Sequence, residues 1–346
     1  MKINQARSPY SQMFYAFQIL LLVLFGYLYW QNQVSSVLAN FHGNDFAHNY
    51  LAADLLTKGG NPYDRDQLLM AAQLHGIPQT NPYVYPLFVA VLFIPLTLFN
   101  FVTAKLIWFI LNQIMWFSVL GLTVSRFPKA LKQMGFILGL GMSALYYPMT
   151  RTLTAGQLNI FILFVLVLAW YFYQKSNKWG AGICLCLATV IKLFPGLFLV
   201  YLILKKQWKT LGAAIVLIGL LFAGGLLAWG PKPFIEYTKM VQSMNYGQSV
   251  WQDGGEVFHV SPANQSIHAL IFRTLTPNPE TIPWSQSPWL AKWLSTLTAL
   301  IVLIIGLGAA WENHCPGMEN LRISSILLTA LLIPSLCWDH YLVYVL

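Results

Sequence analysis

The chain has 346 residues, of which 57% are hydrophobic and only 9% are charged. Soluble domains carry roughly 25% charged residues, so the composition excludes an ordinary soluble protein and predicts a polytopic, all-α membrane protein. The formal net charge of +9 is typical of a membrane protein whose basic residues set its orientation and bind lipid head groups, not of a nucleic-acid-binding protein. The four cysteines have no spacing typical of a disulfide framework or a metal site. The sequence indicates no cofactor.

The first apolar run, from about 13 to 30, has basic residues before it and no small-residue cleavage site, so it is predicted to be a retained first helix. Further runs long enough to cross a bilayer lie at about 84 to 99, 103 to 124, 134 to 150, 157 to 174, 180 to 204, 208 to 229, 289 to 311 and 322 to 338. A tenth run begins at Tyr341 and reaches Leu346. We therefore expect further helices after this single membrane domain of residues 1–346.

Two polar intervals, about 31 to 83 and about 230 to 288, interrupt the apolar pattern. With a cytoplasmic N-terminus both become outer loops, and the basic residues 205–209 lie inside, as the positive-inside rule prefers. The basic residues between 126 and 178 do not fit this count, so a re-entrant or half-length helix is an alternative there. Most acidic residues of the chain lie in the two intervals: Asp45, Asp54, Asp64, Asp66, Glu236, Asp253, Glu256 and Glu280. Any chemistry is therefore expected on the outer face.

The first interval is predicted to form two short helices. Asn44 is typical of a helix N-cap with Asp45 in the first turn, and Asp64 is typical of the cap of the second helix. Asp45 is either a general base or an acid that only stabilises its helix through the helix dipole. His48 shares its face. Asp54 with Lys58 at i+4 is typical of a solvated pair.

Lys192 lies in the middle of an apolar run of about 25 residues, the stretch from 180 to 204. An ammonium group at such a depth costs about 2.5 to 3.5 kcal/mol, so we expect it to face a cavity, a carboxylate or a phosphate. The alternative is that it snorkels toward the cytoplasmic end of the helix. Pro195 is predicted to kink the helix just after it.

Three further groups of polar residues have a functional and a structural interpretation. Gln157 and Asn159 begin an apolar helix, where amides also join helices to one another. Asn264 and Gln265, with Arg273 nearby, are suited to a polar groove that attracts anions. Asp339 and His340 stand at a membrane boundary; on an α-helix adjacent side chains diverge by about 100°, so we do not expect them to hydrogen-bond each other.

Several short motifs follow one another along almost the whole chain. They are Asp45-Phe46, Tyr50 with Ala52-Ala53, Gly59-Gly60-Asn61-Pro62-Tyr63-Asp64, Tyr85-Pro86-Leu87, Gly156-Gln157-Leu158-Asn159, Ala181-Gly182, Ile191-Lys192-Leu193-Phe194-Pro195, Asn264-Gln265-Ser266 and Trp338-Asp339-His340-Tyr341. In this order they resemble the family 87 glycosyltransferases, GT-C enzymes that include polyprenyl-phosphate-mannose-dependent mannosyltransferases. The family often has proline and histidine where this chain has Leu87 and Tyr341, which leaves the sugar open.

The resemblance implies a GT-C-type helix bundle in the bacterial inner membrane, with its active site facing the periplasm or exterior. It further implies transfer of a hexose, most simply mannose, from a polyprenyl-phosphate donor to a glycolipid or glycan acceptor, with inversion and with an acid of the first loop, Asp45, as base. The predicted partners are these lipids and the membrane, without nucleic acid. The predicted substrate-binding residues are His48, Tyr50, Lys58, Gln157, Asn159, Lys192, Asn264, Gln265, Arg273, Asp339 and His340. The rival interpretation is a secondary transporter that uses Lys192.

Overall fold

The computed structural model describes residues 9–78, 80–242, 244, 259–311 and 318–346, so Asp253 and Glu256 lie outside the described residues. All regular elements in these ranges are helices, which confirms the all-α prediction. Four helices are long and apolar enough to cross a membrane, or five if the bent pair α8 and α9 counts as one span. The chain is therefore an all-α polytopic membrane protein.

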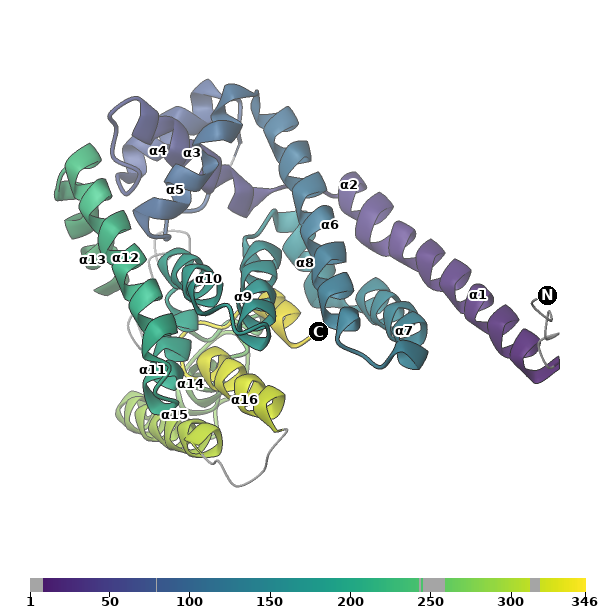
Figure 1. Ribbon diagram of the computed structural model, residues 1–346. Helices are drawn as coiled ribbons and strands as arrows, with labels where there is room; N and C mark the ends of the chain where they lie inside the picture. The colour runs from purple at the N-terminus through teal and green to yellow at the C-terminus, as the bar shows by residue number, and fades with distance from the viewer. Residues whose placement is uncertain (1–8, 79, 243, 245–258, 312–317) are drawn as a thin grey trace.

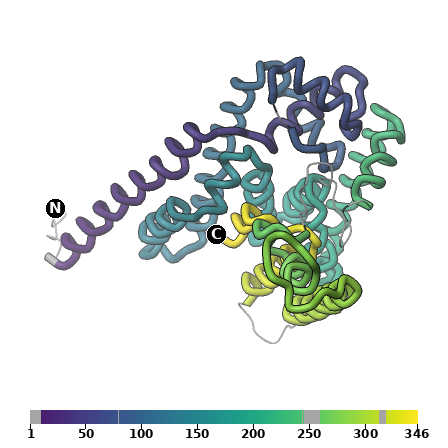
Figure 2. Tube along the Cα trace, turned by 180° about the vertical axis from the view of Figure 1, so that it is seen from behind, coloured from purple at the N-terminus to yellow at the C-terminus, as the bar shows by residue number. Residues whose placement is uncertain are grey.

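The first helix is longer than the sequence predicts. Helix α1 (Pro9–Tyr29) continues through a π-helical turn (Trp30–Ser35) into α2 (Ser36–Ala39), so the first polar interval begins at about residue 40 and not at 31. The polar residues of the turn are satisfied inside the protein: Gln33 is fully buried and its amide donates to the carbonyl of Ser143 at 2.9 Å. Both views show α1 projecting away from the other helices (Figures 1 and 2).

The two short helices of the first interval are present as α3 (Asn44–Thr57) and α4 (Arg65–Leu74). Asp45 is in the first turn of α3, as predicted, but the N-cap position belongs to Gly43 and not to Asn44. Gly43 has φ +64°, a left-handed conformation that glycine adopts without steric cost. The cap at Asp64 is confirmed, because its carboxylate accepts the backbone N–H groups of residues 66 and 67.

Two of the predicted spans are broken into shorter helices. The run from 84 to 99 forms only α5 (Leu87–Phe93) and the 3-10 turn η2 (Ile94–Leu98). The run from 134 to 150 forms α7 (Lys132–Leu145) and α8 (Tyr147–Ala155), preceded by the 3-10 turn η3 (Lys129–Leu131). The run from 157 to 174 agrees with the single helix α9 (Asn159–Gln174). Helices α8 and α9 meet at 114°, so the re-entrant alternative considered for this region has a structural basis.

The predicted span from 180 to 204 is also interrupted. It consists of α10 (Lys178–Ile191), the 3-10 turn η4 (Phe194–Gly196) and α11 (Leu197–Leu204). Lys192 has an extended backbone between them, so it lies at a break and not in the middle of a helix. Pro195 accounts for the break, because it has no N–H to donate to the carbonyl four residues earlier, which is that of Ile191.

Three predicted spans agree with single long helices: α6 (Phe101–Ser125), α12 (Trp208–Trp229) and α15 (Pro288–Trp311). The run from 322 to 338 differs, because α16 (Glu319–Leu332) ends early and the tenth run is the 3-10 helix η6 (Asp339–Val345). The second polar interval contains α13 (Lys232–Gln242) and α14 (Ile267–Leu275).

Helices α3, α4 and α5 form a cap at one end of the bundle, while α8, α9 and η6 lie below it near the centre (Figure 1). Helix α13 lies beside this cap, where the ring of Tyr237 is 6.0 Å from that of Tyr63. Helix α14 instead packs against α15. The two polar intervals therefore meet through α13, and α14 belongs to a separate part of the bundle.

Gly156, between α8 and α9, allows α3 of the cap to pack closely against this part of the bundle. Gly156 has φ +69°, and a Cβ atom there would lie 2.7 Å from Cβ of Phe46 in α3. We expect Gly156→Ala to lower the free energy of unfolding by about 2 to 4 kcal/mol, because it combines left-handed strain with overpacking. The measurement is the thermal unfolding of the purified protein.

Gly59→Ala is the matched control for this substitution. Gly59 has φ +74°, but a Cβ atom there would meet nothing within 4 Å, so only the strain of about 1 to 2 kcal/mol remains. Equal losses of stability in the two variants would show that the contact between Gly156 and Phe46 does not contribute.

Candidate active site

The Asp45 carboxylate is held by two side-chain amides. Its Oδ1 accepts a hydrogen bond from Nδ2 of Asn81 at 3.0 Å, and its Oδ2 accepts one from Nε2 of Gln157. The Asp45 side chain is 16% exposed. A carboxylate has about four acceptor positions on its two oxygens, so these contacts orient the group and leave lone pairs free to accept a further proton donor.

Asp45 and Gln157 are 112 residues apart, and local backbone contacts bring them together. The N–H of Gly43, just before α3, donates to the carbonyl of Thr154 at the end of α8 at 3.0 Å. The indole of Trp108 donates to the carbonyl of Gly156 at 3.0 Å, which fixes the turn before Gln157. The first turn of α3 is therefore joined to the bend between α8 and α9.

Tyr85 determines which way the Gln157 amide points. Its hydroxyl donates to Oε1 of Gln157 at 3.0 Å, so the NH₂ group of the same amide faces Asp45. Tyr85 is 6% exposed, and its ring lies 5.6 Å from the His48 ring and 5.8 Å from Nζ of Lys192. Tyr85 is therefore the residue that connects the carboxylate to the buried lysine.

Lys192 has partners inside the protein. Its Nζ donates to Oδ1 of Asn159 at 2.7 Å and lies 3.6 Å above the centre of the Tyr341 ring. The Tyr344 hydroxyl donates to the same oxygen at 3.0 Å, and Nδ2 of Asn159 donates to the carbonyl of His340 at 3.1 Å. Lys192 is 7% exposed, so an amide oxygen and an aromatic ring take the place of the cavity, carboxylate or phosphate that the sequence predicts.

Asp339 and His340 lie in contact, although the ring of His340 makes no hydrogen bond in the described parts of the chain, as the prediction for the two side chains has it. Oδ1 of Asp339 accepts the backbone N–H of His340 at 2.7 Å and lies 3.3 Å from Nδ1 of its ring. The two residues begin a 3-10 helix after an extended Trp338, so the divergence of side chains along an α-helix does not apply. Oδ2 of Asp339 is 3.6 Å from Nε of Arg151 in α8.

The sequence interpretation missed Asn81 and Arg151, and it gave Tyr85 no role. Asn81 has no signal in its local sequence. Arg151 does have one, because it is a lone cation directly after the apolar run from 134 to 150, and the reasoning applied to Lys192 applies equally to it.

Three residues predicted to bind substrate belong to the packed cap. Tyr50 is 1% exposed and its hydroxyl donates to the carbonyl of Phe99 at 2.8 Å. His48 is 2% exposed, which leaves it no surface for a substrate. Lys58 donates to Oδ2 of Asp54 at 2.7 Å, which confirms the predicted pair. The pair is not the solvated one expected, because Asp54 is 7% exposed and the same oxygen is 3.1 Å from Nε2 of His75. Tyr50 and His48 are therefore core residues in this structure.

The predicted residues of the second interval support another segment. The Asn264 side chain donates to the carbonyl of Ser335 at 2.9 Å and accepts the N–H of Cys337 at 3.0 Å. Gln265 is exposed and donates to the carbonyl of Pro262, while Arg273 donates to the carbonyls of Ser261 and Asn264. These residues hold the turn that precedes Trp338, and the hydrogen bonds of the Asn264 side chain join the segments 261–265 and 335–337.

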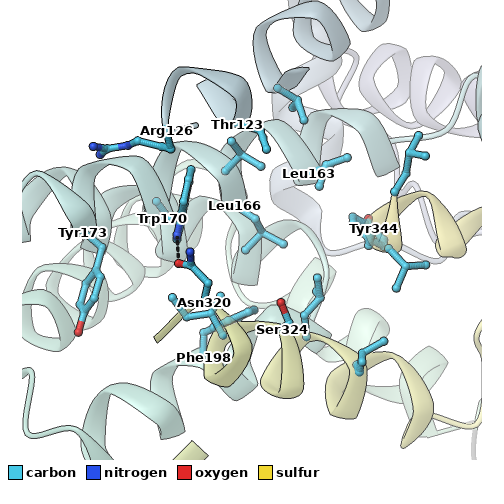
Figure 3. A pocket seen from close by; sticks show the side chains of 18 of the residues that line it. Thr123, Arg126, Leu163, Leu166, Trp170, Tyr173, Phe198, Asn320, Ser324 and Tyr344 are labelled. Atoms are coloured by element: carbon cyan, nitrogen blue, oxygen red, sulfur yellow. Dashed lines mark hydrogen bonds between the residues drawn. The ribbon is translucent and has the colours of Figure 1, made fainter. Parts of the chain in front are cut away.

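A large cavity in the described part of the bundle does not contain Asp45. It has a volume of about 690 Å³, and apolar side chains of α6, α9, α10, α11 and α16 line most of it. Figure 3 shows Arg126, Trp170 and Tyr173 at one end of this cavity and Tyr344 at the other. Tyr344, which lines it, also donates to Asn159 in the hydrogen-bond network of Lys192.

The burial of His48 makes stability depend on pH. Burial lowers the pKa of His48 from 6.5 to about 4. The charge of Asp45, whose Oδ1 lies 3.9 Å from Nδ1 of the ring, raises the pKa, and the charge of Arg65 lowers it slightly further. The other groups that face the ring are Tyr83 and Tyr85. Between pH 6.5 and 4 the unfolded chain binds the proton more tightly, so stability falls as the pH falls. At pH 5 this costs roughly 2 kcal/mol.

The prediction is a smaller loss of melting temperature between pH 7.5 and pH 5 in His48→Leu than in the unsubstituted protein. Leucine does not titrate and leaves no buried ring nitrogen without a partner. The same loss in both proteins would mean that His48 is not the acid-sensitive group.

Comparison with known proteins agrees with the predicted family. The sequence profile of glycosyltransferase family 87 matches residues 83–337. A polyprenol-phosphate-mannose-dependent alpha-(1-2)-phosphatidylinositol pentamannoside mannosyltransferase of Mycobacterium tuberculosis is 22% identical over 267 residues, which cover 76% of this chain and 56% of the relative.

A polyprenol-phosphate-mannose-dependent alpha-(1-2)-phosphatidylinositol mannoside mannosyltransferase of Mycolicibacterium smegmatis is 24% identical over 234 residues, or 65% of this chain and 48% of the relative. The chain thus spans about half the length of the curated relatives it matches. No solved structure gives a significant match. Because the family profile covers well over half of its residues, the chain belongs to glycosyltransferase family 87.

Proposed function

We propose that this protein transfers mannose from a polyprenyl-phosphate-mannose donor to a lipid-linked glycan acceptor at the outer face of the membrane, with inversion at the sugar carbon. The observation that carries the proposal is the Asp45 carboxylate, which two amides hold in the cap while part of it stays exposed. The donor and the kind of acceptor in this proposal are inferred from the two relatives, which are named as polyprenol-phosphate-mannose-dependent mannosyltransferases of phosphatidylinositol mannosides.

Asp45 acts as the general base in this proposal. The acceptor hydroxyl lies within about 3 Å of the carboxylate and attacks the anomeric carbon. As the new bond forms, the hydroxyl proton passes to Asp45 and the bond between the sugar and the phosphate oxygen breaks. The electron pair of that bond leaves with the carrier phosphate. Asn81 and Gln157 keep the carboxylate directed at the hydroxyl, which is the positioning that such a step requires.

The transporter interpretation loses its main support. It needs Lys192 to be available to a substrate or a coupling ion, whereas the ammonium group is buried between Asn159 and Tyr341. Membership of a glycosyltransferase family also favours an enzyme.

The test is transfer of label from a panel of polyprenyl-phosphate sugars to lipid acceptors in membranes that contain the full-length protein. We expect transfer from the mannose donor and little from the other sugars. The anomeric configuration of the product, compared with that of the donor, reports inversion or retention. No transfer from any donor would contradict the proposal and favour the transporter.

A further inference from the structure

A carrier phosphate that departs as an anion needs a cation beside it, and the three cations predicted from the sequence have other partners. Lys58 is paired with Asp54, and Arg273 donates to two backbone carbonyls. Lys192 is buried against Asn159 and Tyr341. Lys192 is thus enclosed and Arg273 is bound to the backbone, while the charge of Lys58, whose side chain is 60% exposed, is already neutralised by Asp54.

Among the described residues, Arg151 differs from all three in having no hydrogen-bonded partner. Its side chain is 39% exposed, and its contact with a charged group is the one between Nε and Oδ2 of Asp339 at 3.6 Å. That separation is too long for a hydrogen bond. Within the described parts of the chain the guanidinium has no hydrogen-bond acceptor, and its Nε atom is itself shielded from solvent. Arginine carries five N–H donors, so this group is a charged donor without an acceptor.

The position of Arg151 suits the same site as Asp45. It lies in α8, whose last turn contacts Gly43 through Thr154 and leads directly to Gln157. The charges of both Asp45 and Arg151 act on His42, which stands just before α3. A donor phosphate that contacts Arg151 would thus be near the base on the cap.

We propose that Arg151 binds the phosphate of the polyprenyl donor and that Asp339 holds the guanidinium while the donor is absent. This inference rests on the proposed function and adds to it the residue that receives the leaving group. The phosphate changes from a singly charged diester to a more highly charged monoester when its bond to the sugar breaks. A guanidinium therefore stabilises the departing group more than the bound donor.

The exchange of partners is geometrically simple. A phosphate offers two oxygens to the planar fork of arginine, whereas Asp339 offers one distant oxygen. When Arg151 turns to the phosphate, Asp339 keeps the hydrogen bond from the backbone N–H of His340 at 2.7 Å. Neither group is left without a partner.

The experiment measures direct binding of a short-chain polyprenyl phosphate to the purified protein by quenching of tryptophan fluorescence. For Arg151→Ala we expect the Kd to rise by about 10- to 100-fold. A polyprenol of the same chain length, which has no phosphate, should bind the variant and the unsubstituted protein equally. Arg151→Lys should retain part of the affinity, because a lysine keeps the charge but loses the bidentate geometry.

Arg126→Ala is the matched control, because this arginine lies 4.8 Å from the centre of the Tyr171 ring at the end of α6 remote from the cap (Figure 1). Its Kd for the phosphate should not change. An unchanged Kd in Arg151→Ala would overturn the proposal, and so would an equal loss of affinity for the polyprenol.

Asp339→Asn provides a second variant that does not depend on whether Arg151→Ala folds. It removes the competing charge, so polyprenyl phosphate should bind several-fold more tightly; weaker or unchanged binding would contradict the exchange. The binding assay also separates the two proposals. If the protein binds the phosphate through Arg151 but transfers no sugar, the proposed function fails alone; if it transfers mannose and Arg151→Ala binds normally, this inference fails alone.

Discussion

Asp45→Asn is expected to reduce mannosyl transfer by about two to four orders of magnitude, with binding of the lipid donor largely retained. Asparagine has nearly the volume of aspartate but cannot accept the proton. The surrounding amides can accommodate it: Tyr85 fixes the NH₂ group of Gln157 toward residue 45, so the asparagine oxygen faces Gln157. Its own NH₂ group then faces Asn81, whose amide is free to turn. Initial rates and donor Kd, measured on the same preparation, test this expectation.

Two neighbouring acids are the controls for this result. Asp64→Asn should change neither the transfer rate nor the stability appreciably, because asparagine caps a helix about as well as aspartate. Asp54→Asn should cost more than a surface pair, on the order of 1 kcal/mol of stability, because its Oδ2 meets both Lys58 and His75. Its transfer rate should not change. If Asp45→Asn keeps more than about a tenth of the activity, well outside the range for a lost base, the base lies elsewhere and Asp339 is the next candidate.

The features that were predictable from the sequence depend on neighbouring residues. The cap at Asp64, the first-turn position of Asp45 and the pair of Asp54 with Lys58 each involve groups at most four positions apart. Long uniform apolar runs such as that of α12 are also recognisable, because hydropathy alone determines whether a helix of this length is stable in lipid. The choice of Asp45 follows from such a local pattern together with the motif order.

The remaining features depend on contacts that sequence spacing does not contain. Asn81 meets Asp45 across 36 residues and Gln157 meets it across 112. A hydropathy window does not detect the burial of Gln33, because the carbonyls that satisfy its amide come from α7. At Lys192 the proline signalled a kink, but the partner, Asn159, comes from another helix. The sequence therefore predicts where a buried charge lies and not what binds it.

Lys192→Ala is expected to insert into the membrane at least as well as the unsubstituted protein, because it removes a buried charge, and yet to lose about 10²-fold in transfer. Asn159 keeps the hydrogen bond from Tyr344, so its oxygen is not left without a donor and the fold should persist. The Tyr341 ring loses the cation that packs on it. Asn159 also loses the hydrogen bond from Lys192 and stands two residues after Gln157, which orients Asp45. A displacement of about 1 Å there is enough for a loss of that size.

Two further substitutions of Lys192 distinguish a positioning role from phosphate binding. Lys192→Met keeps most of the volume beneath Tyr341 and should retain more activity than Lys192→Ala. Lys192→Arg introduces a larger group at a position that is 7% exposed, so overpacking should make it as poor as alanine. Near-normal transfer in Lys192→Arg together with loss in Lys192→Met would instead indicate that the charge meets the carrier phosphate. Transfer rates, normalised to the amount of inserted protein, decide between these outcomes. Full activity in Lys192→Ala would show that Lys192 has no role in the reaction.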